Sequence, residues 1–336
     1  MLIICHHLLI DGISWRILLE DLQLLYTQLS QTGEAQLPFK TLPSRDWVNQ
    51  LETLDKSSEL GYWQAITNES RPPFPMDFPD GTNTMALANT VSVCLPETDT
   101  QQLLQQVPAA YNIHIDDLLL TALGLTLTPW AGNTLRIAME GHGRPDDSNL
   151  TRTVGWLTTL YPVLLQMPET DNLGTTIKAV KETLRAVPDQ GLGYGILRYL
   201  QNGDQNLATE TPIRFNYLGQ TDQLFNGLLA PASESTGMSR SPHDNRDVLI
   251  EINAVVSRGQ LNLHWTYGQE IHRQETIQSL ANSYLHQLRK LIDYCLSSET
   301  DQGYSPADFP QMDLAQGELN DLLSSLDLVD AGGEMS

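Results

Sequence analysis

The chain has 336 residues, of which 40% are hydrophobic and 18% are charged. This composition is typical of a globular protein with a large core, and the length predicts two domains or one large two-lobed domain. Asp and Glu number 41 against 19 Lys and Arg, which gives a net charge of −22. A negative field of this size repels phosphate backbones, so we expect no binding to nucleic acid.

The sequence also lacks the features of a membrane or exported protein. No apolar run is long enough to span a bilayer, and no positively charged region precedes the apolar N-terminus, as it would in a signal peptide. The three cysteines, Cys5, Cys94 and Cys295, lie in apolar stretches and are not spaced like metal ligands. We therefore expect a cytoplasmic protein with reduced cysteines in its core, no metal site and no membrane contact.

The first candidate cluster lies at the start of the chain. The apolar run Leu2–Cys5 predicts a buried strand, and it leads into H-H-L-L-I-D-G at residues 6–12. After this segment Ser14 is the expected N-cap of a helix over Trp15–Leu29, in which large apolar residues recur at helical spacing. Gly33 is expected to end the helix region.

The two histidines of this cluster have two interpretations. Either His6 and His7 are hydrogen-bonded core groups, or one imidazole faces a cleft as an acid or base, since histidine titrates near neutral pH. Asp11 can orient an imidazole or pair with an arginine to brace the turn, and bracing is the simpler expectation.

The second candidate cluster follows the segment Leu135–Met139, whose alternating apolar residues predict a strand with one buried face. The strand runs into Glu140, and Gly141, His142 and Gly143 form a turn after it. A carboxylate at such a junction can point into a cavity while glycine lets the backbone approach a ligand closely. The alternative is an ordinary strand exit, and the histidine cluster favours a site.

The remaining periodicity predicts alternating helices and strands, as in an α/β fold. Helices are predicted over a segment from Trp47 to Leu60 and over 103–107, 115–130, 172–187 and 277–295. Strands are predicted from residue 90, in the apolar half of 152–165, over 213–220, and as a hairpin of 249–256 and 261–267. Pro162 predicts an edge strand or a kink.

Three further segments complete the prediction. Arg144, with Asp146 and Asp147, is expected on an exposed charged loop. The glycine-dense segment 188–195 is expected to open a helix, but it lacks the Lys and Ser/Thr and the preceding strand of a phosphate-binding loop. The tail from Ser305 begins as a proline-containing linker and continues as an acidic amphipathic segment to Leu328.

Several motifs together resemble the epimerization domain of non-ribosomal peptide synthetases, within the condensation-domain superfamily. They are H-H-L-L-I-D-G with S-W-R-I-L-L-E-D-L, D-L-L-L-T-A-L-G, E-G-H-G-R, R-T-V-G-W-L-T-T-L-Y-P, P-D-Q-G-L-G-Y-G and F-N-Y-L-G-Q. The histidine motif alone indicates only the superfamily. The E-G-H-G-R, P-D-Q-G-L-G-Y-G and F-N-Y-L-G-Q motifs are more particular to epimerization domains.

The resemblance implies a chloramphenicol acetyltransferase-like fold, in which two α/β lobes form a V around a tunnel. A complete domain of this family has a substantial section before the histidine motif, so we expect the N-terminal lobe to be incomplete. The expected division is residues 1–85 for the remainder of the N-terminal lobe, 86–300 for the C-terminal lobe and 301–336 for a linker or docking tail.

The resemblance also implies an activity, the inversion of the α-carbon of an aminoacyl or peptidyl thioester from L to D. One group removes the α-proton and a second returns a proton on the opposite face, and His7 and Glu140 are the expected pair. Tyr217 and Asn216 are candidates for stabilising the enolate-like intermediate. The expected supporting residues are His6, His142 as a turn or wall residue, and Asp11 and Arg152 as scaffold, paired with one another.

The implied partner is a peptidyl carrier domain whose phosphopantetheine arm holds the substrate, so no cofactor is expected to bind the chain directly. The tail either docks a downstream synthetase subunit or is an ordinary terminal helix. Two other functions stay open. One is amide formation, as in a condensation domain, and the other is an inactive fragment or carrier-docking module.

Overall fold

The structure is a computed structural model that describes residues 2–145, 148–201, 207, 209–225, 228–232, 234–297, 303–309, 311–312 and 314–322. Its helices are α1 Gly12–Thr32, α2 Ser44–Leu51, α3 Leu60–Asn68, α4 Glu97–Gln101, α5 Val107–Ala110, α6 Ile115–Ala131, α7 Leu173–Arg185, α8 Leu192–Gly195 and α9 Gln274–Ser297. Its strands are β1 Ala88–Leu95, β2 Thr134–Gly141, β3 Thr159–Gln166, β4 Ile213–Gln220, β5 Ile250–Ser257 and β6 Gln260–Gly268. The predicted α/β class is confirmed.

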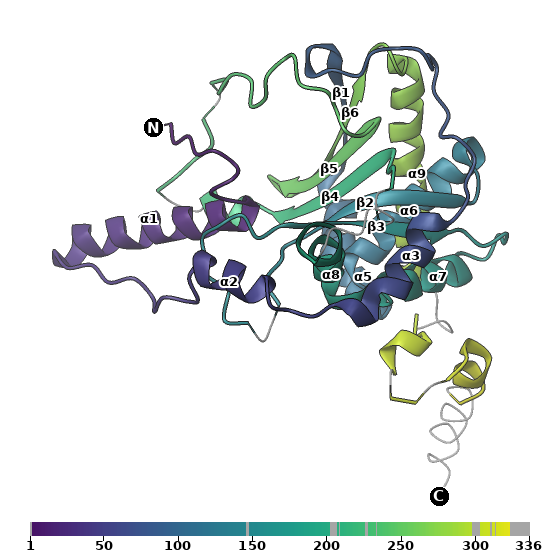
Figure 1. Cartoon of the computed structure of the whole chain (residues 1–336), viewed down its shortest axis with the longest axis horizontal. Helices are drawn as coiled ribbons and strands as arrows, with labels where there is room; N and C mark the ends of the chain where they lie inside the picture. The colour runs from purple at the N-terminus through teal and green to yellow at the C-terminus, as the bar shows by residue number, and fades with distance from the viewer. Residues whose placement is uncertain are drawn as a thin grey trace, which may run out of the picture. The chain divides into compact units, whose positions relative to one another are not determined.

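The six strands form one mixed sheet in the order β1-β6-β5-β4-β2-β3 (Figure 1). Strand β4 pairs in parallel with β2 and β5, whereas β6 pairs antiparallel with β5 and β1. The predicted hairpin is β5 and β6. Strand β3 lies at an edge of the sheet, which agrees with Pro162 because proline cannot donate a hydrogen bond to a neighbouring strand.

The two faces of this sheet differ in chemistry. Alternate residues of β5 and β6 are buried, and the pattern continues on β4 with Ile213 and Phe215. Each large apolar side chain buried on this face contributes about 1.5–3 kcal/mol to folding. The opposite face carries polar residues, namely Glu140, Arg214, Asn216, Glu251, Asn253, His264 and Thr266. The polar face of β2 and β4 is where the second candidate cluster lies.

The N-terminal prediction is wrong in two respects. Residues 2–5 form no strand, and Leu2, Ile3 and Ile4 are 63%, 47% and 81% exposed. A strand needs a neighbour to pair with its backbone, and none of the described residues pairs with this run. In addition, Asp11 rather than Ser14 is the N-cap of α1, because its side chain accepts a hydrogen bond from the Ser14 N–H. Gly33 ends the helix in a left-handed conformation, as predicted.

Two further expectations need correction. The helix predicted from Trp47 to Leu60 is two helices, α2 and α3, with a break between them. Among the cysteines only Cys295 is buried, whereas Cys5 is partly buried and Cys94 is exposed. Cys94 lies on edge strand β1, where alternation places it on the accessible face.

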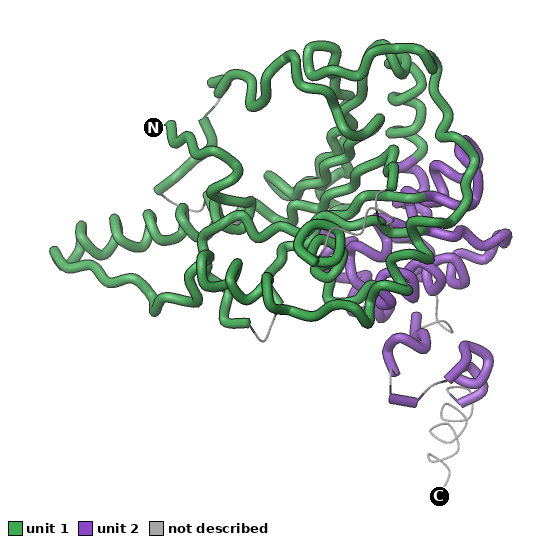
Figure 2. Tube along the Cα trace, viewed as in Figure 1, with its two compact units in different colours: residues 1–100, 136–164, 187–283 green, residues 101–135, 165–186, 284–336 purple. Residues whose placement is uncertain are grey.

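The chain divides into two compact units (Figure 2). Unit 1 comprises residues 1–100, 136–164 and 187–283, and it contains both candidate clusters and most of the sheet. Unit 2 comprises residues 101–135, 165–186 and 284–336. The expected lobe boundaries stay a prediction. No helix within the described ranges is both long and apolar enough to cross a membrane.

Unit 2 holds the described part of the tail on α7. The Lys181 side chain is 1% exposed, and its ammonium donates to Asp308 Oδ2 at 2.6 Å and to the Asn112 and Gly303 carbonyls. The Ala307 N–H donates to a Glu182 carboxylate oxygen. Residues 316–322 are helical, and the expected continuation to Leu328 lies outside the described residues.

Candidate active site

The first cluster is anchored by Asp11, which is 1% exposed. Its Oδ1 accepts hydrogen bonds from the Ser14 N–H and hydroxyl, both at 2.8 Å, and Oδ2 accepts one from the Leu157 N–H at 3.1 Å. Ser14 Oγ also lies 2.9 Å from the Gly155 carbonyl oxygen and 3.0 Å from its nitrogen. Asp11 therefore caps α1, and Asp11 and Ser14 together fix the backbone on both sides of Trp156.

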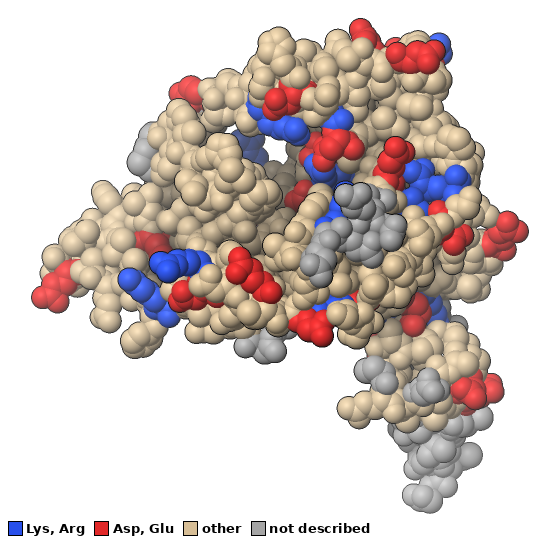
Figure 3. Space-filling model, viewed as in Figure 1, with Lys and Arg blue, Asp and Glu red and all other residues tan. Residues whose placement is uncertain are grey.

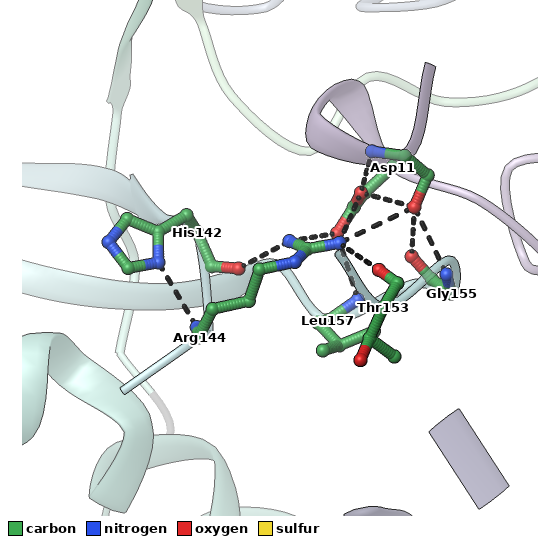
Figure 4. A network of polar contacts seen from close by, with 7 residues as sticks. Asp11, His142, Arg144, Thr153, Gly155 and Leu157 are labelled. Carbon is green, nitrogen blue, oxygen red and sulfur yellow. Dashed lines mark hydrogen bonds and ion pairs between the residues drawn. The ribbon is translucent and has the colours of Figure 1, made fainter. Parts of the chain in front are cut away.

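Asp11 also forms a buried ion pair with Arg144 (Figure 4). The guanidinium donates to both carboxylate oxygens, Nη1 to Oδ2 at 2.9 Å and Nη2 to Oδ1 at 3.0 Å. It donates further to the carbonyls of His142 and Thr153. The expectation that Asp11 braces the turn through an arginine is confirmed, but Arg144 is buried rather than exposed. Asp146 and Asp147 lie outside the described residues.

Burial alone would raise the pKa of Asp11, but the hydrogen bonds from Arg144, Ser14 and Leu157 outweigh it and lower that pKa below its usual value. The expected pairing of Asp11 with Arg152 is wrong. Arg152 instead contacts Glu20 and Asp21 on α1 and is 30% exposed. The two acidic side chains lie one helical turn or more beyond Asp11, which keeps Arg152 outside the buried network.

The turn after β2 depends on Gly143, which has φ +62°. A Cβ atom there would lie 1.6 Å from the Leu157 carbonyl oxygen, so only glycine fits without movement of the backbone. The neighbouring His142 accepts a hydrogen bond through Nδ1 from the Arg144 N–H at 3.1 Å. His142 thus lies in the turn, in agreement with its expected place.

Glu140 ends β2 on the polar face of the sheet, with its side chain 27% exposed. Its Oε2 accepts a hydrogen bond of 2.8 Å from the Asn216 amide on β4, and Oε1 lies 3.9 Å from Arg214 Nε. Burial raises the pKa of Glu140. The positive charges of Arg214 and of protonated His7 act in the opposite direction, and the carboxylates of Glu251 and Asp247 raise this pKa further.

His7 and Glu140 both belong to unit 1, and the charge of His7 is among the causes that lower the pKa of Glu140. His7 is exposed, and its ring centroid lies 5.7 Å from that of Trp156 in an edge-to-face arrangement. His6 has a different contact, because its Nδ1 accepts a hydrogen bond from the Leu8 N–H within the turn. These placements agree with His7 as the residue open to a substrate and His6 as turn support, and both roles stay predictions.

Asn216 and Tyr217 differ in position, although the sequence suggests them as a pair. Successive strand residues point to opposite faces, so Tyr217 lies on the face of Ala254, its partner on β5, whereas Asn216 lies with Glu140. Of the two, Asn216 is the residue that contacts the candidate carboxylate. The role of Tyr217 in charge stabilisation stays a prediction.

The space-filling view shows a hollow in the surface of unit 1, with acidic and basic side chains around it (Figures 2 and 3). Within the described ranges, no group of three or more His, Cys, Asp and Glu side chains could hold a metal ion. The carboxylate, imidazole and amide groups described above can transfer protons and form hydrogen bonds.

Two arginines of the region were not predicted from the sequence as site residues. The sequence points to Arg144 only by its spacing. Arg144 stands four residues after Glu140, just as Asp11 stands four residues after His7. Arg214 stands two residues before Asn216 in a strand, and this spacing places it on the same face.

A family model described as the Condensation domain matches residues 1–311. The chain is 40% identical over 343 residues to chondramide synthase cmdD of Chondromyces crocatus and 38% identical over 339 residues to tyrocidine synthase 2 of Brevibacillus parabrevis. The alignments cover 97% and 96% of this chain but 9% of each of those synthases. The chain thus spans less than a tenth of the length of these two relatives.

Among solved structures, the epimerization domain from the third module of tyrocidine synthetase B matches with a TM-score of 0.80 and 38% identity, covering 87% of this chain and 68% of that one. The X-domain from teicoplanin biosynthesis matches with a TM-score of 0.64 at 16% identity, covering 86% and 68%, and shows a shared fold alone. The chain belongs to the condensation-domain family. Its predicted chloramphenicol acetyltransferase-like fold and its place among non-ribosomal peptide synthetase domains are confirmed.

Proposed function

We propose that the chain epimerizes the α-carbon of an aminoacyl or peptidyl thioester in non-ribosomal peptide synthesis. The observation that carries this proposal is the partly buried Glu140 carboxyl, bound at Oε2 by the Asn216 amide, whose pKa is raised by burial and lowered in part by the charge of His7. The 38% identity to an epimerization domain supports the same activity. Neither amide formation nor a docking role requires a second proton carrier at this place.

In the proposed reaction one of the two residues removes the α-proton, and the electron pair moves into the thioester carbonyl to form an enolate. The other residue then gives a proton to the opposite face of the same carbon, so no other bond is made or broken. A raised pKa keeps a proton on the carboxyl of Glu140 to a higher pH than an ordinary glutamate would hold it. The imidazole of His7 has a ring nitrogen that can accept a proton and give it back.

Of Asn216 and Tyr217, only Asn216 has a part in this proposal. The Asn216 amide holds Oε2 of Glu140 and so fixes the direction of the carboxyl group. No part is proposed for Tyr217, because it lies on the opposite face of β4 from Glu140. The Asp11–Arg144 pair joins the segment that follows His7 to the loop that follows Glu140.

The proposed partner is a carrier domain that brings the substrate on its phosphopantetheine arm, so that the chain itself needs no bound cofactor. The tail is a second proposed contact, with a downstream synthetase subunit. In unit 2 the described part of the tail borders a hollow of about 520 Å³ lined by residues of α7 together with Pro306, Gln316 and Asn320. Deletion of the tail would abolish transfer to the next subunit if this docking occurs, and would leave it unchanged otherwise.

The activity is tested by incubating the full chain with a carrier-bound L-aminoacyl thioester and no acceptor. Epimerization predicts a mixture of D and L products after hydrolysis and chiral separation. A condensation activity predicts retained L configuration here and a dipeptide after an acceptor thioester is added. Binding to the carrier with neither product would support a docking module and contradict the proposal.

A further inference from the structure

Arg214 lies at the centre of the charges that surround Glu140. In the sheet it is paired with Ala138 on β2 and with Glu251 on β5. Its side chain is 12% exposed, with Nη1 3.9 Å from Glu251 Oε1 and Nη2 in direct contact with Asp247 Oδ2. The remaining nitrogen, Nε, is the one that lies 3.9 Å from Glu140 Oε1.

This Nε is buried and has no hydrogen-bond partner within the described part of the chain. Leaving a buried charged donor without an acceptor is unfavourable, so such groups call for an explanation. A distance of 3.9 Å is too long for a hydrogen bond, yet a movement of about 1 Å would bring Oε1 within reach. Arg214 is therefore placed to bind Glu140 when the carboxyl is ionised and not when it is protonated.

The two oxygens of Glu140 are distinguished by their neighbours. Oε2 is already an acceptor for the Asn216 amide. Oε1 is therefore the oxygen on which a proton can sit without disturbing that bond. When this proton leaves, Oε1 becomes an anionic acceptor that faces the Arg214 N–H.

We propose that Arg214 is a positioning residue for the proposed epimerization, which receives Oε1 of Glu140 when the carboxyl loses its proton and is held back from a permanent ion pair by Asp247 and Glu251. This proposal rests on the function proposed above. Three carboxylates share one guanidinium in this arrangement, and the shortest contact goes to Asp247. Glu140 thus receives only part of the positive charge and remains able to take its proton back.

The other charged groups near Glu140 are consistent with one Arg214 guanidinium shared among three carboxylates. Protonated His7 acts on Glu140 from the N-terminal loop. Arg246, in the loop before β5, is buried and donates to Asn83 Oδ1 and to the carbonyls of Leu249 and Thr266. Arg246 is thus bonded to neutral groups. Among the described residues, Arg214 is the arginine whose guanidinium lies in ion-pair range of Glu140.

The test compares Arg214→Gln, Asp247→Asn and the double variant with the unchanged chain. Glutamate labelled with ¹³C at Cδ reports the protonation of Glu140, whose signal is assigned by its loss in Glu140→Gln. We expect the titration midpoint of Glu140 to rise in Arg214→Gln and to fall in Asp247→Asn, where Arg214 is released towards Oε1. Asp247 is 58% exposed, so solvent screening makes its effect the smaller one.

The double variant separates an action through Arg214 from a direct effect of the Asp247 charge. If Arg214 carries the effect, Asp247→Asn shifts the midpoint much less in the Arg214→Gln background. An equal shift in both backgrounds, or no shift in Arg214→Gln, would contradict the proposal. Asp244→Asn is the matched control, since this exposed residue of the same loop pairs with Arg240 and should leave the midpoint unchanged.

The α-proton exchange rate of the same variants adds a functional measurement. We expect Arg214→Gln to lower the rate by up to about 100-fold, because a misplacement of a reacting group by about 1 Å can cost this much. A chain that exchanges no α-proton at all would contradict the proposed function, whereas the ¹³C titration still decides the link between Arg214 and Glu140. The two failures are thereby distinguishable.

Discussion

Asp11 and Arg144 are 133 positions apart in the sequence, yet they form a two-point ion pair with side chains only 1% and 5% exposed. Each residue stands four positions after a proposed proton carrier, Asp11 after His7 and Arg144 after Glu140. The pair therefore joins the segment that follows His7 to the loop that follows Glu140. It acts by position, since neither residue needs to touch the substrate.

Replacing Asp11 with Asn should destabilise the chain by about 3–5 kcal/mol, because the buried Arg144 guanidinium would lose its anionic partner. Urea unfolding measures this change. The control is Arg152→Gln, which removes an arginine from a partly exposed pair with Glu20 and Asp21 and should cost at most about 1 kcal/mol. Similar losses in the two variants would contradict the special importance of the buried pair.

The same pair predicts a pH dependence of stability. The pKa of Asp11 is lowered in the folded chain, so its stabilising effect is complete above the unfolded value of 3.8. That effect is lost as pH falls through the lower folded value, where protonation breaks the contact with Arg144. Unfolding free energies measured between about pH 6 and pH 2 should show this acid-dependent loss in the unchanged chain, and Asp11→Asn should lack this component.

Glu140 should contribute a pH dependence of stability that is opposite in sign to that of Asp11. Burial raises its pKa above the ordinary value of 4.5, so the folded chain loses stability as pH rises from 4.5 through the folded pKa. Glu140→Gln removes the charge and keeps an oxygen that can accept from Asn216. We expect this variant to be more stable at neutral pH by about 0.5–1 kcal/mol, as is common when a functional charge is removed. A less stable variant would show that the charge supports folding.

Local pattern predicts most of the sheet. Residues 213–220 are predicted as a strand and form β4 with the same ends, and the hairpin of β5 and β6 is predicted to within a few residues. These strands succeed because one face is buried and each side chain therefore has one required direction. The run Leu2–Cys5 has a strand-like composition as well, but composition does not supply a pairing partner.

The candidate site, too, could be predicted only in part from local sequence pattern. Alternation places Glu140 on the polar face of β2 and Asn216 on that of β4, so their meeting follows from period and pairing. The burial of Arg144 does not follow, because its glycine- and aspartate-rich surroundings are typical of an exposed loop. Only the arrival of Asp11 from a distant segment changes that environment, and a single sequence does not show this contact.

Gly143→Ala tests the turn that follows Glu140. The left-handed φ and the close Leu157 carbonyl should make this substitution cost at least about 1–3 kcal/mol. Gly61→Ala is the control, because no atom lies within 4 Å of its added Cβ on helix α3. That change should be neutral or stabilising by up to about 1 kcal/mol. Thermal or urea unfolding compares the two, and a tolerated Gly143→Ala would contradict the described turn.

Asp308→Asn tests how the tail is held in unit 2. It leaves the buried Lys181 ammonium with carbonyl partners alone, which should weaken the attachment of residues 303–309 by about 1–3 kcal/mol. Hydrogen exchange of these amides should become faster. The exposed Asp321 of the same tail offers a control in Asp321→Asn, for which unchanged exchange is expected. Equal effects would show that Lys181 does not hold the tail.

The most direct test of the proposed function is the exchange of the substrate α-proton with solvent. The full chain is incubated in D₂O with a carrier-bound L-aminoacyl thioester, and mass spectrometry measures deuterium at the α-carbon, with Glu140→Gln and His7→Ala alongside. The proposed mechanism predicts deuterium incorporation with inversion by the unchanged chain and its loss, by about 100-fold or more, in both variants. Incorporation that persists in both variants would contradict the assignment of His7 and Glu140 as the two proton carriers.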